Sequence, residues 1–154
     1  KVKVGNITLG NSMAIHPMEG CDGELNGDPG ELPIRRYERF AAGGSKLLWF
    51  EATAIREDGR ANARQLWLHD NNIEAYSSLV NRILSIHKER FGSTDDLIMP
   101  VQLTHSGRYS YPNRIIGYHN PLIDAKTNTP ASQAPILSGA MKRLRLSMNA
   151  LLYR

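Results

Sequence analysis

Polar residues that could bind a ligand gather in three short segments of this sequence, residues 16–23, 51–60 and 102–108. Each segment follows an apolar run that predicts a strand. The third segment holds Gln102, whose side-chain amide can donate and accept hydrogen bonds at once, and also His105. Because ligands bind at the carboxyl ends of strands in both open α/β sheets and barrels, the three segments predict a ligand site at one edge.

The remaining reactive side chains do not predict a metal centre or a disulfide. No histidine shows the HExxH motif or another close metal-ligand spacing. The histidines are His16, His69, His87, His105 and His119. Cys21 is the single cysteine, so an intrachain disulfide is excluded, and we expect an ordinary loop thiol. Glu51 follows a largely apolar run, which favours a buried carboxylate that ties neighbouring loops over a solvated acid.

The elements that position these segments alternate between strand and helix. Residues 1–10 predict a small hairpin, and a short apolar run at 12–15 stops at Pro17, which has no N–H for strand pairing. A long glycine-rich loop is expected over residues 19–32. The next elements are expected in the order helix, strand, helix, strand, at residues 33–43, 46–54, 73–91 and 97–103.

Two of these elements carry the fold prediction. Residues 46–54 are nearly continuously apolar, which is typical of a strand buried on both faces of a parallel sheet. Asn71 or Asn72 can cap the helix that follows. Repeated strand–helix units predict an α/β fold with right-handed crossovers, either an open sheet or a barrel.

Composition and charge narrow the classes of protein. The chain has 154 residues and a formal charge of +4, and no apolar run approaches the roughly 18 residues of a membrane helix. We therefore expect a cytoplasmic protein without a membrane partner. After Asp124 there is no acidic residue, and the basic residues that give the chain its positive charge follow it. This basic segment predicts either a nucleic-acid-binding surface or a solvated helix face. No aromatic stacking pattern accompanies the charges, so we expect no nucleic-acid partner.

Three motifs in sequence order resemble the old yellow enzyme family of FMN-dependent oxidoreductases, which are (β/α)₈ TIM barrels. The first is GNITLGNSMAIHPMEG, and the second is RRYERFAAGGSKLLWFEATAI followed by GRANARQLWLHD. The third, PVQLTHSGRYSY, is similar to the family's QLxHxGR signature and favours the 2,4-dienoyl-CoA reductase-like branch. The resemblance covers residues 4–135, whereas residues 136–154 form a divergent basic tail with helical spacing.

The resemblance implies a flavin site and its function. FMN contacts are implied at Pro17, Met18, Glu19, Ala52 and Gln102, and His105 and Arg108 lie in a possible active-site loop. Packing in the core is the alternative role for Met18 and Ala52, and a structural hydrogen bond is the alternative for His105. The implied reaction passes a hydride from NADH or NADPH through FMN to an activated alkene, a small unsaturated molecule.

The chain is shorter than a complete barrel of the family that it resembles. A complete barrel takes about 250 residues, so we expect one partial TIM-barrel domain over residues 1–154, with roughly three to four βα units and an N-terminal hairpin. The family's catalytic groups are expected beyond residue 154. An alternative is therefore a catalytically incompetent half barrel that self-associates into a homo-oligomer through exposed strand edges. A weaker alternative is a basic interaction module at residues 138–154.

Overall fold

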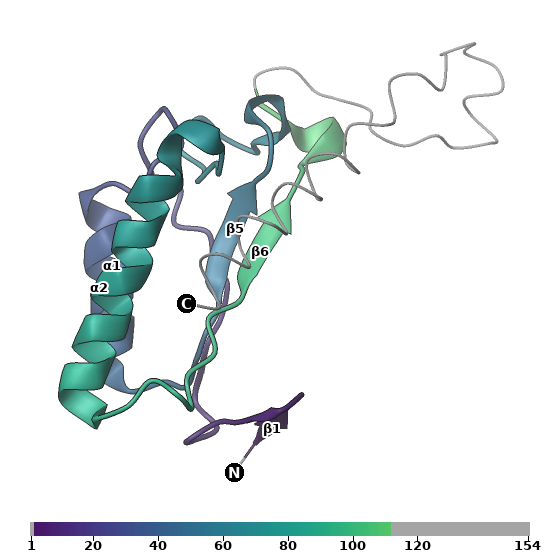
Figure 1. The fold of residues 1–154 in the computed structure, drawn as a ribbon. Coiled ribbons are helices and arrows are strands. Elements are labelled where there is room, and N and C mark those ends of the chain that lie inside the picture. Colours follow the sequence, from purple (N-terminus) through teal and green to yellow (C-terminus); the bar gives the residue numbers. More distant parts are fainter. Residues whose placement is uncertain (1, 112–154) are drawn as a thin grey trace, which may run out of the picture.

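The computed structural model describes residues 2–111 of the chain, in which strands and helices alternate. Two helices lie together on one side of the strands (Figure 1). The expected basic helix in residues 136–154 lies outside the described residues, as does any fourth βα unit. No helix in residues 2–111 is long and apolar enough to cross a membrane.

The chain opens with the predicted hairpin. Strand β1 (Lys3–Val4) pairs antiparallel with β2 (Ile7–Thr8), and Gly5 adopts φ 58° in the turn between them. A short third strand, β3 (Ala14–Ile15), follows and ends before Pro17, as the lack of a proline N–H predicts.

A parallel arrangement of strands forms the centre of the described region. β4 (Leu47–Leu48) pairs in parallel with β3, and β5 (Phe50–Ala54) pairs in parallel with β6 (Val101–Thr104). The parallel pairing confirms the prediction, but the strand expected over residues 46–54 is divided between β4 and β5. The strand expected over 97–103 begins late because Pro100 has no N–H to donate, although the Pro100 carbonyl still accepts from Phe50 N at 2.8 Å.

Two helices cover one face of these strands (Figure 1). α1 (Glu31–Gly43) carries Pro33 in its first turn and ends at Gly44, whose φ of 85° suits glycine. α2 (Ile73–Phe91) ends in the same way at Gly92. Asn72 is the N-cap residue of α2, but its side chain makes no capping hydrogen bond, because it bonds to the preceding loop instead.

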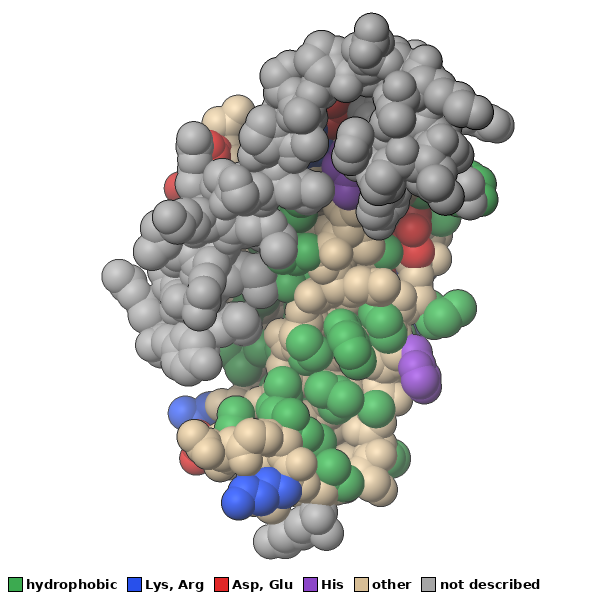
Figure 2. Space-filling view, turned by 90° about the vertical axis from the view of Figure 1, so that its right-hand side faces the viewer, with side chains coloured by type: hydrophobic (Ala, Val, Ile, Leu, Met, Phe, Trp, Pro, Cys, Tyr) green, Lys and Arg blue, Asp and Glu red, His purple; other side chains and the backbone are tan. Residues whose placement is uncertain are grey.

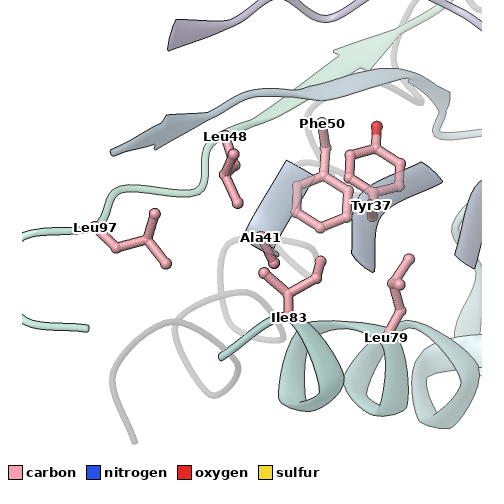
Figure 3. Packing of buried hydrophobic residues seen from close by; sticks show 7 residues of the cluster. All are labelled: Tyr37, Ala41, Leu48, Phe50, Leu79, Ile83 and Leu97. Carbon is pink, nitrogen blue, oxygen red and sulfur yellow. The ribbon is translucent and has the colours of Figure 1, made fainter. Parts of the chain in front are cut away.

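The core lies between the helices and the strands (Figure 3). Its buried members come from α1, α2 and the strand segments, namely Tyr37, Ala41, Leu48, Phe50, Leu79, Ile83 and Leu97. The rings of Tyr37 and Phe50 stack at 4.4 Å between centroids. The opposite face of the strands is only partly buried in the described part of the chain. Thr53 and Ala54 at the end of β5 are both fully buried, as burial on both faces predicts, whereas Trp49 before β5 is 40% exposed. Hydrophobic side chains gather on that face in Figure 2.

Candidate flavin site at the strand ends

A shift of register in β5 shapes the site. Phe50 lies opposite Val101 and Ala52 lies opposite Gln102, so Glu51 is an additional residue without a partner on β6. Such a bulge bends a strand and re-aims one of its side chains. Here the additional residue is the glutamate that the sequence marks as a buried carboxylate.

The bulge leaves the backbone of Glu51 outside the strand ladder, and side chains satisfy it. Glu51 N donates to the Tyr37 hydroxyl at 2.7 Å, and the Glu51 carbonyl accepts from Thr53 Oγ1 at 3.0 Å. Both Phe50, which stacks on Tyr37, and Glu51, which bonds to its hydroxyl, thus face α1. Burial and the nearby Glu51 carboxylate raise the pKa of the Tyr37 hydroxyl, so it stays protonated.

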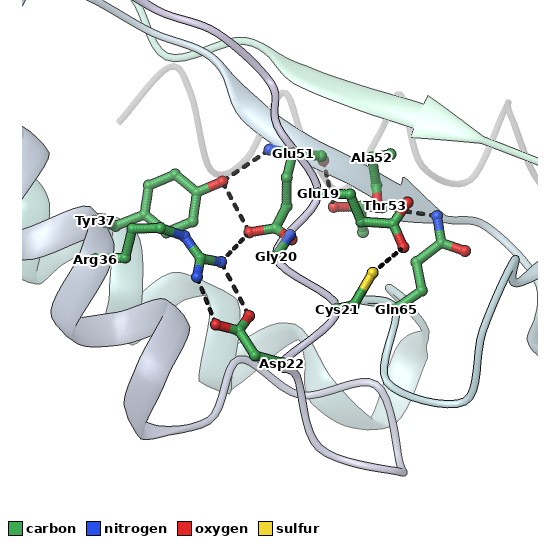
Figure 4. Close-up of polar contacts among 10 residues, drawn as sticks. All are labelled: Glu19, Gly20, Cys21, Asp22, Arg36, Tyr37, Glu51, Ala52, Thr53 and Gln65. Atoms are coloured by element: carbon green, nitrogen blue, oxygen red, sulfur yellow. Dashed lines mark hydrogen bonds and ion pairs between the residues drawn. The ribbon is translucent and has the colours of Figure 1, made fainter.

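The Glu51 carboxylate joins three segments that are separate in sequence (Figure 4). Its side chain is only 2% exposed. Oε2 accepts from Gly20 N at 2.8 Å, and Oε1 accepts from Arg36 Nη2 at 2.5 Å. This geometry confirms the predicted buried carboxylate that ties loops together, and it gives the buried charge both a cation and a backbone donor.

Arg36 extends this connection to the loop after β3. Its Nη1 donates to Asp22 Oδ2 at 2.5 Å and its Nη2 to Asp22 Oδ1 at 3.1 Å, a two-pronged ion pair. Burial alone would lower the pKa of the Arg36 guanidinium, but the hydrogen bonds to Asp22 and Glu51 outweigh it and raise the pKa. Arg36 is therefore a permanent cation between two carboxylates.

The first group of predicted flavin contacts lies in the segment that Glu51 holds. Pro17 is half-buried and Met18 is 77% exposed, so Met18 is not a core residue within the described part. The Glu19 side chain turns towards the loop after β5, where its Oε1 accepts from Asn62 Nδ2 at 2.6 Å. Cys21 is an exposed free thiol with φ 52°, and slight burial and neighbouring Glu19 raise its pKa, as suits an unreactive loop thiol.

The second group lies on β5 and β6. Val101 packs against the core, so the next residue, Gln102, points to the other face of the strand, and Ala52 lies beside it in register. Gln102 is exposed, which corrects the expectation that this amide sits at the end of a buried strand among protein partners. The reason is that nothing in residues 2–111 covers Gln102. Within these residues its amide has no hydrogen-bond partner.

The third predicted group is His105 and Arg108, and His105 makes contacts within the protein. His105 Nδ1 accepts from Gly107 N at 3.0 Å, and its ring packs against Gly59, where a Cβ would lie 2.7 Å from the ring. These contacts tie the end of β6 to the loop after β5 and favour the structural role for His105. Arg108 lies in the single turn η3 (Gly107–Tyr109). In residues 2–111 no group of three acidic, histidine or cysteine side chains could hold a metal ion.

The chain is similar to known proteins in sequence and in fold. No protein-family model matches the chain. Curated NADPH dehydrogenases from Listeria monocytogenes and Listeria innocua are 30% identical to it over 135 residues, which is 83% of this chain and 36% of each relative. The solved old yellow enzyme of Trypanosoma cruzi shares the fold, with a TM-score of 0.57 and 22% identity over 77% of this chain. In sequence the chain is similar to these NADPH dehydrogenases, and in fold it is similar to old yellow enzymes.

The chain spans about a third of the length of the old yellow enzyme relatives that it matches. It covers 29% of the Trypanosoma cruzi enzyme and 28% of a second structure, of TcOYE with pHBA, which has a TM-score of 0.57 and 23% identity. These solved relatives are TIM barrels, so the α/β fold class is confirmed, and the described strands correspond to part of such a barrel.

The sequence does not predict the role of Gln65, a buried residue beside the candidate site. Gln65 is buried in the loop after β5, where its Nε2 donates to the Ala52 carbonyl at 3.1 Å and to Thr104 Oγ1 at 3.2 Å. Its Oε1 accepts from Ala61 N at 2.6 Å. Gln65 therefore joins β5 to β6 beside the candidate site. A glutamine in a polar loop carries no signal of burial, because its partners are backbone groups set by the fold.

Proposed function

We propose that residues 16–20, together with Ala52 and Gln102, form one wall of the FMN site of an oxidoreductase that uses NADH or NADPH. The observation that carries the proposal is the pairing of Ala52 with Gln102 on the exposed face of the strands, next to the segment that Glu51 holds. The similarity to NADPH dehydrogenases and to old yellow enzymes supports a flavoprotein oxidoreductase.

The residue types fit a flavin. The flavin ring system has a flat apolar body and a pyrimidine edge that both donates and accepts hydrogen bonds. Ala52 has a minimal side chain, which lets the ring approach the backbone, and Gln102 offers one donor group and one acceptor at the same face. Pro17 and Met18 provide apolar surface in the adjoining segment. Bound FMN would supply the capacity to accept and donate a hydride.

The proposed reaction is the reduction of an activated alkene, such as an α,β-unsaturated carbonyl compound, by NADH or NADPH. In this proposal the described residues bind and orient the cofactor. Gln102 holds the pyrimidine edge, and Gln65 occupies the Ala52 carbonyl, so that Ala52 offers the ligand its small side chain. The groups that bind and protonate the substrate are expected outside residues 1–154.

Titration of the full chain with FMN tests the cofactor. We expect quenching of flavin fluorescence and a shifted flavin absorption spectrum, and NADPH oxidation in the presence of an alkenone. Gln102→Leu, which removes the amide but keeps an exposed site, should weaken binding, whereas Asn81→Leu on the exposed face of α2 should not. Absence of any flavin binding by the full chain would overturn the cofactor assignment, and binding without NADPH oxidation would overturn the activity for this chain.

A second candidate is a self-associating half barrel without activity of its own. The exposed apolar side chains of Met13 and Trp49, 52% and 40% exposed, favour it. Sedimentation of the full chain tests this candidate. A dimer or larger assembly that Trp49→Glu converts to a monomer would support it, and a monodisperse monomer for the unaltered chain would exclude it.

A further inference from the structure

The side chains of Asp22, Arg36 and Glu51 form one connected unit, which we call the clamp. We propose that the clamp residues are positioning residues, which set where residues 17–20 lie relative to Ala52 and thereby fix the shape of the flavin site. This inference rests on the proposed function, because it assigns the flavin as the group whose binding the clamp controls.

The Glu51 side chain connects two parts of the proposed flavin site, residues 16–20 and Ala52. The Glu51 carboxylate accepts from Gly20 N at 2.8 Å, two residues after Met18. Glu51 is also the residue directly before Ala52 in β5. The path from the apolar segment to the strand therefore runs through one hydrogen bond and one carboxylate. A change in the position of this carboxylate moves residues 17–20 relative to Ala52.

The clamp is needed because residues 16–20 bury little apolar surface. His16, Met18 and Gly20 are exposed, so hydrophobic packing contributes little to holding them. Met18 N bonds only locally, to the His16 carbonyl at 2.8 Å. Polar contacts must hold such a segment, and the strongest are those to ionised groups.

Arg36 keeps the Glu51 carboxylate in place from the helix side. Its guanidinium spans from Glu51 Oε1 to both oxygens of Asp22, which lies in the same loop two residues after Gly20. A Cβ on Gly20 would lie 2.5 Å from Arg36 Nη2 and 2.5 Å from Asp22 Oδ1. The clamp thus fills the space beside Gly20, and it holds this loop at two points from one side.

A second tether makes the clamp testable without loss of the fold. Asn62 Nδ2 donates to Glu19 Oε1 at 2.6 Å, which ties the same segment to the loop after β5. Loss of the clamp should loosen residues 17–20 without releasing them. Glu51→Gln is the sharpest change, because glutamine has the same shape but only one acceptor oxygen for the three donors, Gly20 N, Arg36 Nη2 and the Tyr37 hydroxyl.

Two measurements on the full chain separate positioning from simple stability. Without FMN, hydrogen exchange of the Gly20 amide should be about tenfold faster in Glu51→Gln, because its acceptor is shared or lost. With FMN, the dissociation constant should rise about tenfold, which is a common consequence of loosening a group that supports a ligand contact. The matched control is Asp96→Asn, which removes a charge from a partly buried ion pair at the other end of the strands.

The outcomes are distinct. Faster Gly20 exchange with weaker FMN binding in Glu51→Gln, and neither change in Asp96→Asn, supports the inference. Unchanged Gly20 exchange, or faster exchange with the FMN affinity of the unaltered chain, would overturn it. Failure of the unaltered chain to bind FMN would overturn the proposed function and the clamp's role toward flavin, while the exchange result would still report the tether.

Discussion

The two ends of the strands both place a buried charge between a helix and a strand, but they use it differently. At the carboxyl ends lies the clamp. At the amino ends lies a second group, Lys46, His87 and Asp96, which we call the lower cluster. In the lower cluster, Lys46 Nζ lies 2.9 Å from His87 Nε2 and 2.7 Å from Asp96 Oδ1.

The members of the lower cluster bond to one another and to a helix carbonyl. Because an ammonium group only donates, His87 Nε2 accepts from Lys46, and His87 Nδ1 carries the proton that it donates to the Ala41 carbonyl at 3.0 Å. Burial and the Lys46 charge lower the pKa of His87, and the hydrogen bond from Lys46 lowers the pKa of Asp96. These contacts join α1, α2 and the loop before β6, and none of them reaches residues 16–20, Ala52 or Gln102.

The clamp instead ends on a backbone N–H of an exposed loop segment, beside the side chains proposed to bind flavin. In TIM barrels the carboxyl ends of the strands carry function and the amino ends carry stability. On the proposed function, the fold uses similar ion pairs for both purposes. The difference lies in where each network ends: the clamp ends on the Gly20 N–H beside the proposed flavin residues, and the lower cluster ends on the Ala41 carbonyl and on Asp96 in the loop before β6.

Removal of the clamp carboxylate should give the largest effect. Glu51→Ala removes the acceptor of Gly20 N and leaves the Arg36 guanidinium with Asp22 as its remaining carboxylate partner. We expect a loss of about 3 kcal/mol in the free energy of unfolding, the lower end of the range for a broken buried pair, because Arg36 keeps Asp22 and is 25% exposed. Urea denaturation measures it. A loss below about 1 kcal/mol would mean that the pair behaves as a surface pair.

Removal of the lower cation should destabilise the protein without a functional effect. Lys46→Met leaves His87 Nε2 and Asp96 Oδ1 without their donor, and we expect a loss of about 1–3 kcal/mol. FMN affinity should stay unchanged, which fluorescence titration measures at a temperature where both proteins are folded. Weaker FMN binding would show that the two ends are coupled, contrary to the comparison.

The lower cluster should also make stability depend on pH. The pKa of folded His87 lies below its ordinary value of about 6.5, so the unfolded chain binds more protons as pH falls through that value. Unfolding free energy should therefore decrease below about pH 6.5, by at most about 1.4 kcal/mol per pH unit, until the folded pKa is reached. Denaturation curves between pH 7 and pH 5 measure this, and His87→Gln should flatten the slope. An equal slope in that variant would assign the proton to another group.

A surface ion pair between the helices should give the smallest effect. Arg82 on α2 bonds to Glu38 on α1, and the Arg82 side chain is more than half exposed. Arg82→Ala should change the free energy of unfolding by less than about 1 kcal/mol, since exposed ion pairs contribute little. Thermal unfolding checks it in low and high salt. A loss as large as that of Lys46→Met would remove the distinction between buried and exposed pairs.

The sequence predicts the elements well where local chemistry decides. The hairpin around Gly5, the helix ends at Gly44 and Gly92, and the end of the strand before Pro17 all follow from backbone preferences of single residues. The apolar run before Glu51 correctly predicts a buried carboxylate, because an acid in such a run needs a partner.

The remaining features depend on contacts between distant residues. Nothing local marks Arg36 as a partner of Asp22, since an arginine in an amphipathic helix most often faces water. The burial of Gln65 depends on the Ala52 carbonyl, which only the folded strands provide. The exposure of Gln102 and Trp49 likewise depends on which residues cover the strands, which a continuous apolar run cannot report.

The bulge at Glu51 has a consequence for deletions. Phe50 and Ala52 lie opposite Val101 and Gln102, which are successive residues of β6. Deleting the codon for Glu51 would make Phe50 and Ala52 successive too, and the strand would become regular with both side chains on their present faces. Strand pairing therefore does not require Glu51. The gene carries at that codon a residue that joins α1 to the loop after β3.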